Sequence, residues 1–459
     1  MKITWRFLLV VVSITVFAFA VVFEQQASPA SLPVFVDTAG FVRWSLTGLA
    51  VWLGGLGVLV LAGQALSHLT MQNVFRDIQA SQFTMSTSER AIRLVYQIVI
   101  ALASLYFYLS IPILIAGMVV LSGGIILWLE SFQLRSRRVY LSLFLGVLVV
   151  VGRLVASLFR RVRHADPSRR VGMEEMPLLW QTIREVAQLL HTAPVHHIFL
   201  TYGVDVAVME RGSLLTRLRG KGQRTLILGL GGLYGMTRGQ LRAILAHEYG
   251  HFDNKDTPGG RLASQVSLSI HWMSENLAGR GLLTWLNPVW WFTIGYYRLF
   301  KGITLASSRL SEILADRQAA LACGSLCLSS AILHLMRRDL EFVLQLDGEV
   351  NRAHAAQEGL NNLYHLPPLS SSEVREVERT LAELLHCPSS PSDSHPAPND
   401  RFALIRLVQG PNPAADDPRP ALELLSGAAP AALEQLELQL TANFQKSLVR
   451  QGVLKPGRG

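Results

Sequence analysis

Apolar residues are concentrated in the first third of the chain, where they form four long runs. The runs cover residues 7–23, 44–67, 94–129 and 139–159. A membrane-spanning helix needs about 20 consecutive, mostly apolar residues. Only the fourth run carries a charge, Arg153, which lies near one end where its long side chain can reach the headgroups. We therefore predict a transmembrane region of about four spans over residues 1–160.

The third run is longer than one span requires. As a single straight helix, residues 94–129 would measure about 54 Å at 1.5 Å per residue. That length is nearly twice the thickness of the hydrocarbon layer, which is about 30 Å. We expect this run to bend at Pro112 or at Gly123–Gly124, or to fold back as a tight hairpin.

Basic residues next to the runs set the expected orientation. Lys2 and Arg6 precede the first run, which we interpret as a retained signal anchor, with a cleaved signal peptide as the alternative. Five arginines follow the last run: Arg160, Arg161, Arg163, Arg169 and Arg170. Because positive residues favour the cytoplasmic side, we expect the segment after the last span to be cytoplasmic.

After residue 171 the pattern becomes that of a globular domain. Residues 177–190 repeat apolar positions with a helical period, and short apolar stretches predict strands over residues 198–201, 205–210 and 224–228. Thr237 and Gln240 form a capping-box pattern, which predicts a helix over residues 241–252. A final amphipathic helix is expected over residues 431–449. The predicted fold is mostly α with a small β-sheet.

Three further segments complete the expected organisation. Residues 282–300 are apolar and aromatic, which predicts either a fifth span or a helix on the membrane surface; Pro288 favours the surface helix. Residues 387–400 and 411–420 are rich in Pro, Ser and Asp and are expected to be linkers. We therefore divide the chain into the membrane region, a globular domain over residues 171–410, and a linker with a helix over residues 411–459.

The composition agrees with a membrane protein. It argues against a nucleic-acid-binding protein and against a fold held by cysteines. Half of the residues are hydrophobic and 16% are charged, against about 25% in an ordinary soluble domain. The net charge of +9 comes with arginines beside the apolar runs, and we see no interleaving of basic and aromatic residues that would indicate nucleic-acid binding. The three cysteines form no CxxC pair, so neither a disulfide framework nor a cysteine zinc site is indicated.

The sequence HEYGH, residues 247–251, is the strongest chemical signal. His247 and His251 are four residues apart, so on a helix they project from one face and can bind one metal ion. With a third protein ligand and an open position, one zinc ion per chain would lower the pKa of a bound water to about 7. Glu248 is then placed to act as the general base, which is why metallohydrolases use this spacing.

A second pair of acidic residues follows downstream. Glu312 and Asp316 are also four apart in a helical pattern. Glu312 is the candidate third metal ligand, and Asp316 could hydrogen-bond a ligand histidine from behind. The alternative is that both are solvated helix charges paired with Arg309 or Arg317.

These stretches resemble the membrane zinc endopeptidases that include the CAAX prenyl proteases and the heat-shock protease HtpX. The resemblance runs from about residue 177 to 401 through RTLILGLGGL, LRAILAHEYGHFDNKDT, SRLSEILADRQAA and HPAPNDR. It implies a zincin-like domain in which His247, His251 and Glu312 bind zinc and Glu248 is the catalytic base. It also implies that His395 and Arg401 steady the substrate or the tetrahedral intermediate; the alternative is a turn histidine in a Pro-rich linker.

Two departures limit what the resemblance implies. The family has an Asn-Ala pair on the strand that lines the cleft, whereas this chain has Asp205-Val206-Ala207. Four spans before the catalytic part also differ from a prenyl protease. We expect a zinc endopeptidase that processes or removes membrane proteins, with protein or peptide substrates and contact with the lipid bilayer. Its expected location is the bacterial inner membrane, with the catalytic domain on the cytoplasmic side.

Two other functions fit parts of the sequence. Site-2-type intramembrane proteases combine HExxH with an LDG motif, and this chain contains Leu346-Asp347-Gly348. Charged residues flank both motifs, and burying each charge in hydrocarbon would cost several kcal/mol. A membrane scaffold with a structural zinc site is the other alternative; such sites usually have four protein ligands, often cysteines, and none lies near HEYGH.

Overall fold

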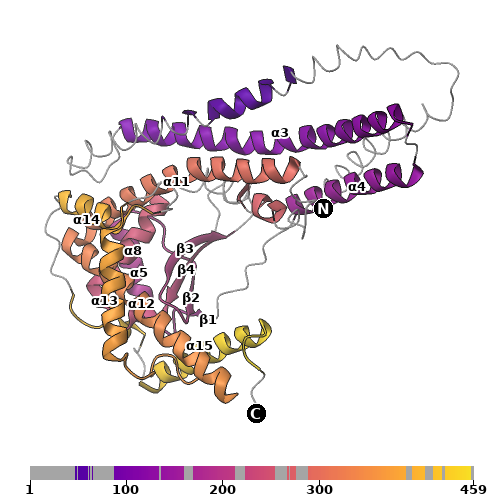
Figure 1. The fold of residues 1–459 in the computed structure, drawn as a ribbon. Coiled ribbons are helices and arrows are strands. Elements are labelled where there is room, and N and C mark those ends of the chain that lie inside the picture. Colours follow the sequence, from indigo (N-terminus) through magenta and orange to yellow (C-terminus); the bar gives the residue numbers. More distant parts are fainter. Residues whose placement is uncertain are drawn as a thin grey trace. The chain divides into compact units, whose positions relative to one another are not determined.

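A computed structural model describes most of the chain, and Figure 1 shows its elements. The described residues are 47–48, 50–59, 61–62, 65, 87–133, 136–159, 169–211, 223–253, 266–267, 269–274, 288–388, 395–408, 417–425 and 430–455. The chain divides into two compact units. The first comprises Met1–Leu69, Ala91–Arg163 and Gly259–Ala306; the second comprises Thr70–Arg90, His164–Pro258 and Ser307–Gly459.

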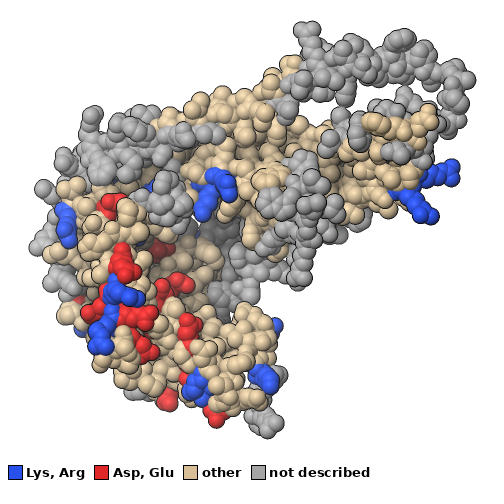
Figure 2. Space-filling view, in the orientation of Figure 1, with Lys and Arg blue, Asp and Glu red and all other residues tan. Residues whose placement is uncertain are grey.

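The first unit is built from long apolar helices. Most of α3 (Thr87–Ser131), all of α4 (Arg137–Phe159) and the first half of α11 (Pro288–Cys323) belong to it. The expected hairpin in residues 94–129 is wrong, because α3 continues as one helix through Pro112. Large apolar side chains such as Leu102, Leu105 and Leu109 are exposed on α3, and Figure 2 shows an almost uncharged surface along it.

Among the residues that the structure describes, one stretch is long and apolar enough to cross a membrane, Ala91–Ile126 within α3. The described part of the second predicted run includes a shorter apolar helix, Ala50–Leu59, and the first run lies outside the described residues. The structure therefore does not confirm four spans, and that number stays a prediction.

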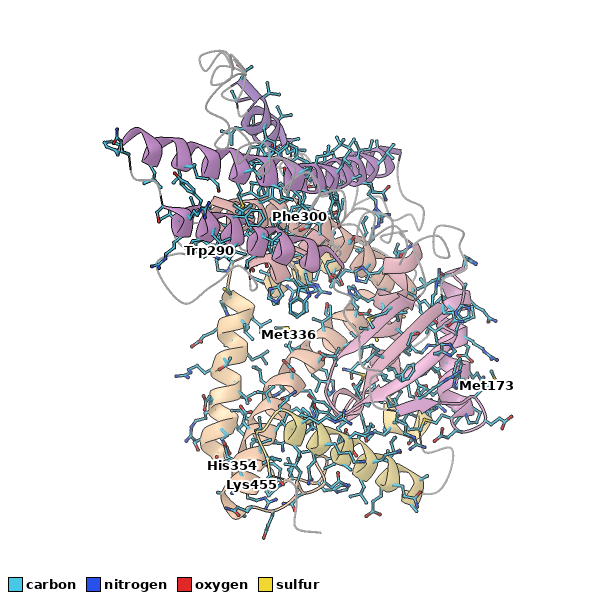
Figure 3. The ribbon with its side chains drawn as sticks, turned by 90° about the vertical axis from the view of Figure 1, so that its right-hand side faces the viewer. Met173, Trp290, Phe300, Met336, His354 and Lys455 are labelled. Carbon is cyan, nitrogen blue, oxygen red and sulfur yellow. The ribbon has the colours of Figure 1, made fainter. Side chains whose placement is uncertain are left out.

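Aromatic residues hold α11 to α3 inside the first unit. The Tyr296 ring stacks on Tyr106 with 6.1 Å between centroids, and its hydroxyl donates a hydrogen bond to the carbonyl of Ala103. Phe300 is fully buried one turn further along α11, where Figure 3 labels it together with Trp290. The described part of the apolar segment predicted over residues 282–300 is the start of α11, which runs from Pro288 to Cys323.

The second unit contains a four-stranded mixed sheet in the order β1-β2-β4-β3. Its strands are β1 (Arg169–Val171), β2 (His197–Thr201), β3 (Val206–Arg211) and β4 (Gln223–Gly229). β2 and β4 are parallel, while β1 and β3 pair antiparallel on either side. The three predicted strands are confirmed, whereas the three-residue β1 is too short to leave a sequence pattern. β3 is an edge strand, with Val206 opposite Leu228.

Helices complete the second unit. They are α5 (Pro177–Leu189), α7 (Leu230–Leu233), α8 (Arg238–Asp253), the end of α11, α12 (Ser325–Ala356), α13 (Ser371–His386), α14 (Pro398–Leu407), η1 (Ala421–Leu424) and α15 (Pro430–Arg450). The predicted linker over residues 387–400 is wrong at its end, because α14 begins at Pro398. A proline suits the first turn of a helix, where its missing N–H has no partner to lose.

Candidate metal centre

Helix α8 forms because its start is capped and its apolar residues are buried. The Gln240 N–H donates to Thr237 Oγ1 over 3.1 Å, and the Thr237 N–H donates to Gln240 Oε1 over 3.0 Å, which confirms the predicted capping box. Leu241, Leu245 and Tyr249 follow at intervals of four and are fully buried. This anchoring fixes the direction in which the remaining face of α8 presents its histidines.

Gly250 lets α8 lie directly against α11. A Cβ atom at this position would lie 2.9 Å from the Ala315 Cα and 3.0 Å from Gln318 Oε1. Contacts that short do not occur at a real side chain, so the two helices can approach this closely only at a glycine. Ala315 lies between Glu312 and Asp316 in sequence, and the close packing brings both carboxylates to the histidines of α8.

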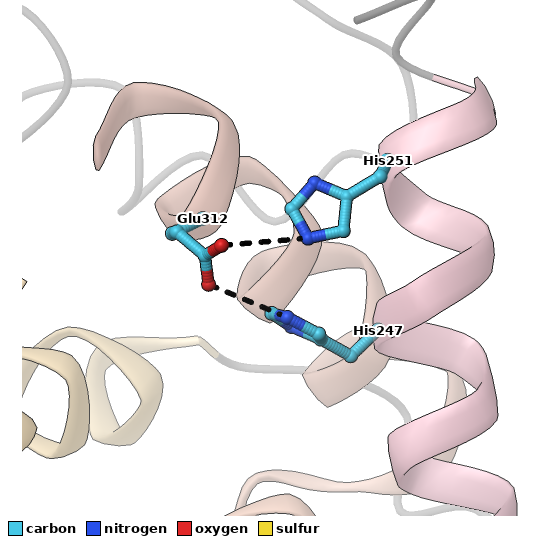
Figure 4. Close-up of side chains that lie close together, drawn as sticks. All are labelled: His247, His251 and Glu312. Carbon is cyan, nitrogen blue, oxygen red and sulfur yellow. Dashed lines mark ion pairs between the residues drawn. The ribbon is translucent and has the colours of Figure 1, made fainter. Parts of the chain in front are cut away.

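His247, His251 and Glu312 form one compact group of potential ligands (Figure 4). The Nε2 atoms of His247 and His251 lie 3.4 and 3.6 Å from the two oxygens of the Glu312 carboxylate. One donor atom from each residue lies within 4.8 Å of the other two. Two imidazoles and one carboxylate around a common point match a three-ligand metal site with an open position.

The burial of these groups supports a metal-binding role. His247 and Glu312 are each only 7% exposed, and Glu312 Oε2 is buried without a hydrogen-bond donor among the described residues. A buried carboxylate oxygen that lacks a donor is costly unless a cation satisfies it. The residues present therefore fit a metal ion. The alternative of solvated helix charges is wrong, because Glu312 and Asp316 are buried and face α8 and α14.

Asp316 lies behind the candidate ligand His247. Its Oδ1 is 2.9 Å from His247 Nδ1, on the opposite side of the ring from the Nε2 that faces Glu312. The guanidinium of Arg401, on α14, holds the same carboxylate with two hydrogen bonds. Burial alone would raise the pKa of Asp316, but Arg401 and His247 outweigh it and keep the pKa below its usual value. Asp316 is therefore a fixed anion that sets the orientation of the imidazole.

The metal-free site is strongly coupled electrostatically. Burial would lower the pKa of His247, but the carboxylates of Asp316 and Glu312 outweigh it and raise this pKa to about 10. Burial would raise the pKa of Glu312, yet His247 and His395 outweigh it and lower that pKa. The pocket thus favours a positive charge beside Glu312, held by a proton in the absence of metal.

The motif HPAPNDR, residues 395–401, reaches the same site. Its residues lie in the first turn of α14 and just before that helix. His395 Nδ1 lies 3.0 Å from Glu312 Oε1, while 62% of the His395 side chain is exposed. The Glu312 carboxylate raises the pKa of His395, against the opposing effect of burial. The structure thus brings His395 and Arg401 to the predicted centre, with His395 open to solvent and Arg401 engaged by Asp316.

Glu248 faces the edge strand β3. The backbone N–H of Val208 donates to Glu248 Oε2 over 3.2 Å, so the carboxylate lies between the histidine helix and the free edge of the sheet. Nothing in the sequence pointed to Val208, because this contact uses a backbone group. The Asp205-Val206-Ala207 stretch leads into the same strand, and the carbonyl of Asp205 accepts from the Gly229 N–H over 2.7 Å.

The LDG motif is not part of this centre. Asp347 lies on α12, is exposed to solvent, and is not a member of the His247, His251 and Glu312 group. The geometry thus removes the observation that favoured a site-2-type protease, because that enzyme class would need the LDG aspartate as its third ligand.

Comparison with known proteins agrees with this geometry. Residues 208–408 match the model of peptidase family M48. The chain is also 24% identical over 228 residues to the Protease HtpX homolog of Aquifex aeolicus (strain VF5), an alignment that covers 46% of this chain and 70% of that protein. The matched segment contains both histidines, Glu312 and Arg401. The resemblance inferred from the motifs is therefore confirmed: residues 208–408 are similar to peptidase family M48, which supports a metallopeptidase.

Proposed function

We propose that this chain is a membrane-anchored, zinc-dependent endopeptidase. One observation carries the proposal: His247, His251 and Glu312 converge on a common point while Glu248 lies beside them against an edge strand. The N, N, O ligand set suits zinc, whose proteolytic sites commonly use two histidines and a glutamate. Bound zinc would supply a water of lowered pKa and polarise the carbonyl of the scissile bond.

Residues of the chain itself bind the peptide, transfer the proton and stabilise the developing charge. An extended peptide can add along the outer edge of β3, where backbone groups pair with it irrespective of its side chains. Glu248 accepts the proton from the attacking water and transfers it to the leaving amine. Asp316 holds His247 through Nδ1 and is itself fixed by Arg401. His395, with its exposed ring next to Glu312, is placed to contact the substrate carbonyl as its negative charge develops.

The membrane assignment rests on the first unit. Ala91–Ile126 is long and apolar enough to span a bilayer, and α3 exposes large apolar side chains along its length. The relative from Aquifex aeolicus carries the name Protease HtpX homolog, the protease whose membrane family the motifs resemble. We propose a multi-pass protein of the bacterial inner membrane whose peptidase domain lies on the cytoplasmic side. Its substrates would be protein chains, including misfolded or unprocessed membrane proteins.

Metal content and cleavage of casein test this proposal together. Wild-type protein should bind one zinc per chain and cleave casein. Glu248→Gln should keep the zinc and lose cleavage, because the amide cannot accept the proton. Glu312→Ala should lose the zinc. Glu434→Gln, an exposed carboxylate on α15, is the matched control and should change neither.

Each departure has a distinct meaning. Zinc binding without cleavage of any protein would favour the structural zinc scaffold, in which Glu248 has no chemical task. Full zinc content in Glu312→Ala would show that another residue is the third ligand. Loss of zinc from Glu248→Gln would mean that Glu248 is a ligand and would overturn its role as the base.

A further inference from the structure

The start of helix α8 is held by a segment that lies beyond the matched peptidase domain. The N–H of Arg238 donates to the carbonyl of Arg419 over 2.8 Å, and the N–H of Gly239 donates to the carbonyl of Asp417 over 3.0 Å. The first N–H groups of a helix have no partner within the helix. Residues 417–425, which we call the clasp, therefore complete the N-terminus of the helix that carries both histidines.

Further contacts fix the clasp in register with the turn before α8. Thr237 forms an antiparallel bridge with Pro420, and the Ala421 N–H donates to the carbonyl of Met236 over 2.9 Å. The Arg238 guanidinium forms a 2.8 Å ion pair with Glu423. The clasp thus binds the turn through backbone groups on both sides of Thr237 and through one side-chain pair.

Helix α15 binds a neighbouring loop through one polar stripe. Glu437, Thr441 and Gln445 are spaced four apart and so share one face of the helix. They accept hydrogen bonds from Asn362 Nδ2 over 2.8 Å, from the Leu363 N–H over 3.3 Å and from the Leu360 N–H over 3.0 Å, respectively. Each polar residue of the stripe therefore matches a donor in the loop that follows α12.

The far end of α15 is tied to α12 as well. His354, at the C-terminal end of α12, contacts the carbonyl of Val453 over 3.0 Å. Figure 3 labels His354 beside Lys455 at this place. Leu448 and Leu454 are buried against Ala353 in a small apolar cluster. The helix is therefore held from Glu437 to its C-terminal end.

Tyr234 connects α15 to the turn that precedes α8. Its hydroxyl donates to Glu437 Oε1, and its ring stacks on Tyr364 with 5.5 Å between centroids. Glu437 is only 1% exposed, and a carboxylate this deeply buried is stabilised only while its hydrogen-bond donors are in place. Tyr234 therefore fixes the chain three residues before the Thr237 cap.

We propose that the clasp and α15 are positioning elements of the peptidase: they hold the turn of residues 234–239, and through it the register of α8 and its two histidines. The inference rests on the proposed zinc function but assigns a role to residues outside the segment that matches family M48. Releasing Tyr234 from Glu437 loosens the start of α8, and the ligand atoms then meet less often in the geometry that binds metal.

The test combines zinc affinity with local hydrogen exchange in the full-length protein. Tyr234→Phe removes the hydroxyl but keeps the stacked ring, and Glu437→Gln replaces the acceptor. Each variant should raise the zinc Kd by about tenfold, the lower end of the loss seen when groups that orient metal ligands are removed. Each should also speed amide exchange in residues 236–246 of the metal-free protein. The double variant should be no worse than the poorer single variant, because the two residues act as one contact.

Controls separate positioning from general destabilisation. Glu434→Gln, on the exposed face of α15, should leave both the zinc Kd and the exchange unchanged. Ile198→Val, a buried position in β2, should lower Tm without raising the zinc Kd. In the Tyr234 and Glu437 variants, kcat for casein should fall while KM changes little, because β3 is untouched.

Two results would overturn the inference. One is unchanged exchange in residues 236–246 together with an unchanged zinc Kd in both variants. The other is a rise in zinc Kd for Ile198→Val equal to that of Tyr234→Phe at the same loss of Tm. If the wild type binds zinc without cleaving, the proposed peptidase function fails while both measurements still decide this inference. If it binds no zinc, the exchange measurement decides alone.

Discussion

Arg401 on α14 holds Asp316 on α11 in a two-pronged ion pair, with Nε 2.8 Å from Oδ2 and a terminal guanidinium nitrogen 2.7 Å from Oδ1. The same Oδ1 lies 2.9 Å from Nδ1 of His247, a candidate metal ligand. A planar guanidinium matches both oxygens of a carboxylate and so fixes its orientation. Arg401 is therefore connected through Asp316 to His247 of the candidate metal centre.

This relationship predicts that Arg401→Lys weakens metal binding. A lysine keeps the charge but cannot hold both oxygens, so Asp316 should turn and release His247. We expect the zinc Kd to rise by about 10- to 100-fold, as for other residues that orient metal ligands. Chelator competition measures it, with Arg406→Lys, an exposed position on α14, as the control.

The opposite outcome also has a clear meaning. If Arg401→Lys binds zinc as the wild type does and loses only kcat, then Arg401 acts on the substrate or the intermediate. That is the role that the family resemblance implies for this residue. Asp316→Asn is the second variant in this test, because it should weaken zinc binding whichever role Arg401 has.

Zinc binding should release a proton from His247. In the metal-free site the pKa of His247 is raised to about 10, so the imidazole is protonated at neutral pH. A histidine must lose that proton to coordinate a metal, so zinc and the proton compete. Zinc affinity should therefore rise with pH by up to about tenfold per unit until about pH 10. Calorimetry in buffers of different ionisation enthalpy measures the released protons.

The stability of the metal-free protein should show the reverse pH dependence. A raised histidine pKa contributes stability that is present below the unfolded value of about 6.5 and is lost as the pH rises toward 10. The lowered pKa values of Glu312 and Asp316 act in the other direction, because their contribution is lost as the pH falls below about 4. Equal pH dependence of Tm between pH 7 and 10 with and without zinc would contradict this coupling.

Gly250→Ala tests whether the approach of α8 to α11 assembles the site. In an open helix this change stabilises by up to about 1 kcal/mol. Here the new Cβ would meet the Ala315 backbone at 2.9 Å, and forcing such a contact typically costs about 1–3 kcal/mol. We expect a lower Tm and a higher zinc Kd, because the helices must move apart.

Gly348→Ala is the matched control for this change. Gly348 lies in the middle of α12, and a Cβ there would have no atom within 4 Å. The substitution should therefore leave zinc binding unchanged and raise Tm slightly, if it changes Tm at all. A Gly250→Ala protein with normal Tm and zinc Kd would show that the contact relaxes without moving the ligands.

The candidate metal centre could be predicted from the sequence because it is made of side chains at helical spacing. The pairs His247/His251 and Glu312/Asp316 each lie four residues apart, so each pair shares a helix face wherever the helix is placed. The capping box at Thr237 and the short run of apolar, mostly buried residues in β4 are likewise local signals. The convergence of the two helices depends on Gly250, and one glycine within a helical motif does not reveal which helix will pack against it.

Other features could not be foreseen for identifiable physical reasons. The contact of Val208 with Glu248 is made by a backbone N–H, which every residue except proline possesses. α3 continues as one helix through Pro112, although proline removes one hydrogen bond and disfavours the preceding turn. The clasp binds α8 through carbonyls of residues 417 and 419, so its composition resembles that of any linker rich in proline and aspartate.

Val208→Pro tests whether the edge strand orients the catalytic base. Proline removes the N–H that lies 3.2 Å from Glu248 Oε2. An edge strand tolerates proline where its N–H does not pair with the sheet, so the fold should survive. Hydrogen bonds to charged groups contribute about 1.5–3 kcal/mol, and we expect kcat/KM for casein to fall by about 10- to 100-fold.

The comparison with Val208→Ile makes this prediction specific, because isoleucine keeps the N–H and should retain activity. Zinc content should stay at one per chain in both variants, since the N–H of Val208 binds Glu248, which is not a candidate ligand of the metal. Loss of zinc in Val208→Pro would indicate that the strand has shifted. The fall in activity could then not be assigned to the lost hydrogen bond between the Val208 N–H and Glu248. Full activity with normal zinc would show that Glu248 is oriented by the metal-bound water alone and that β3 serves only to align the substrate.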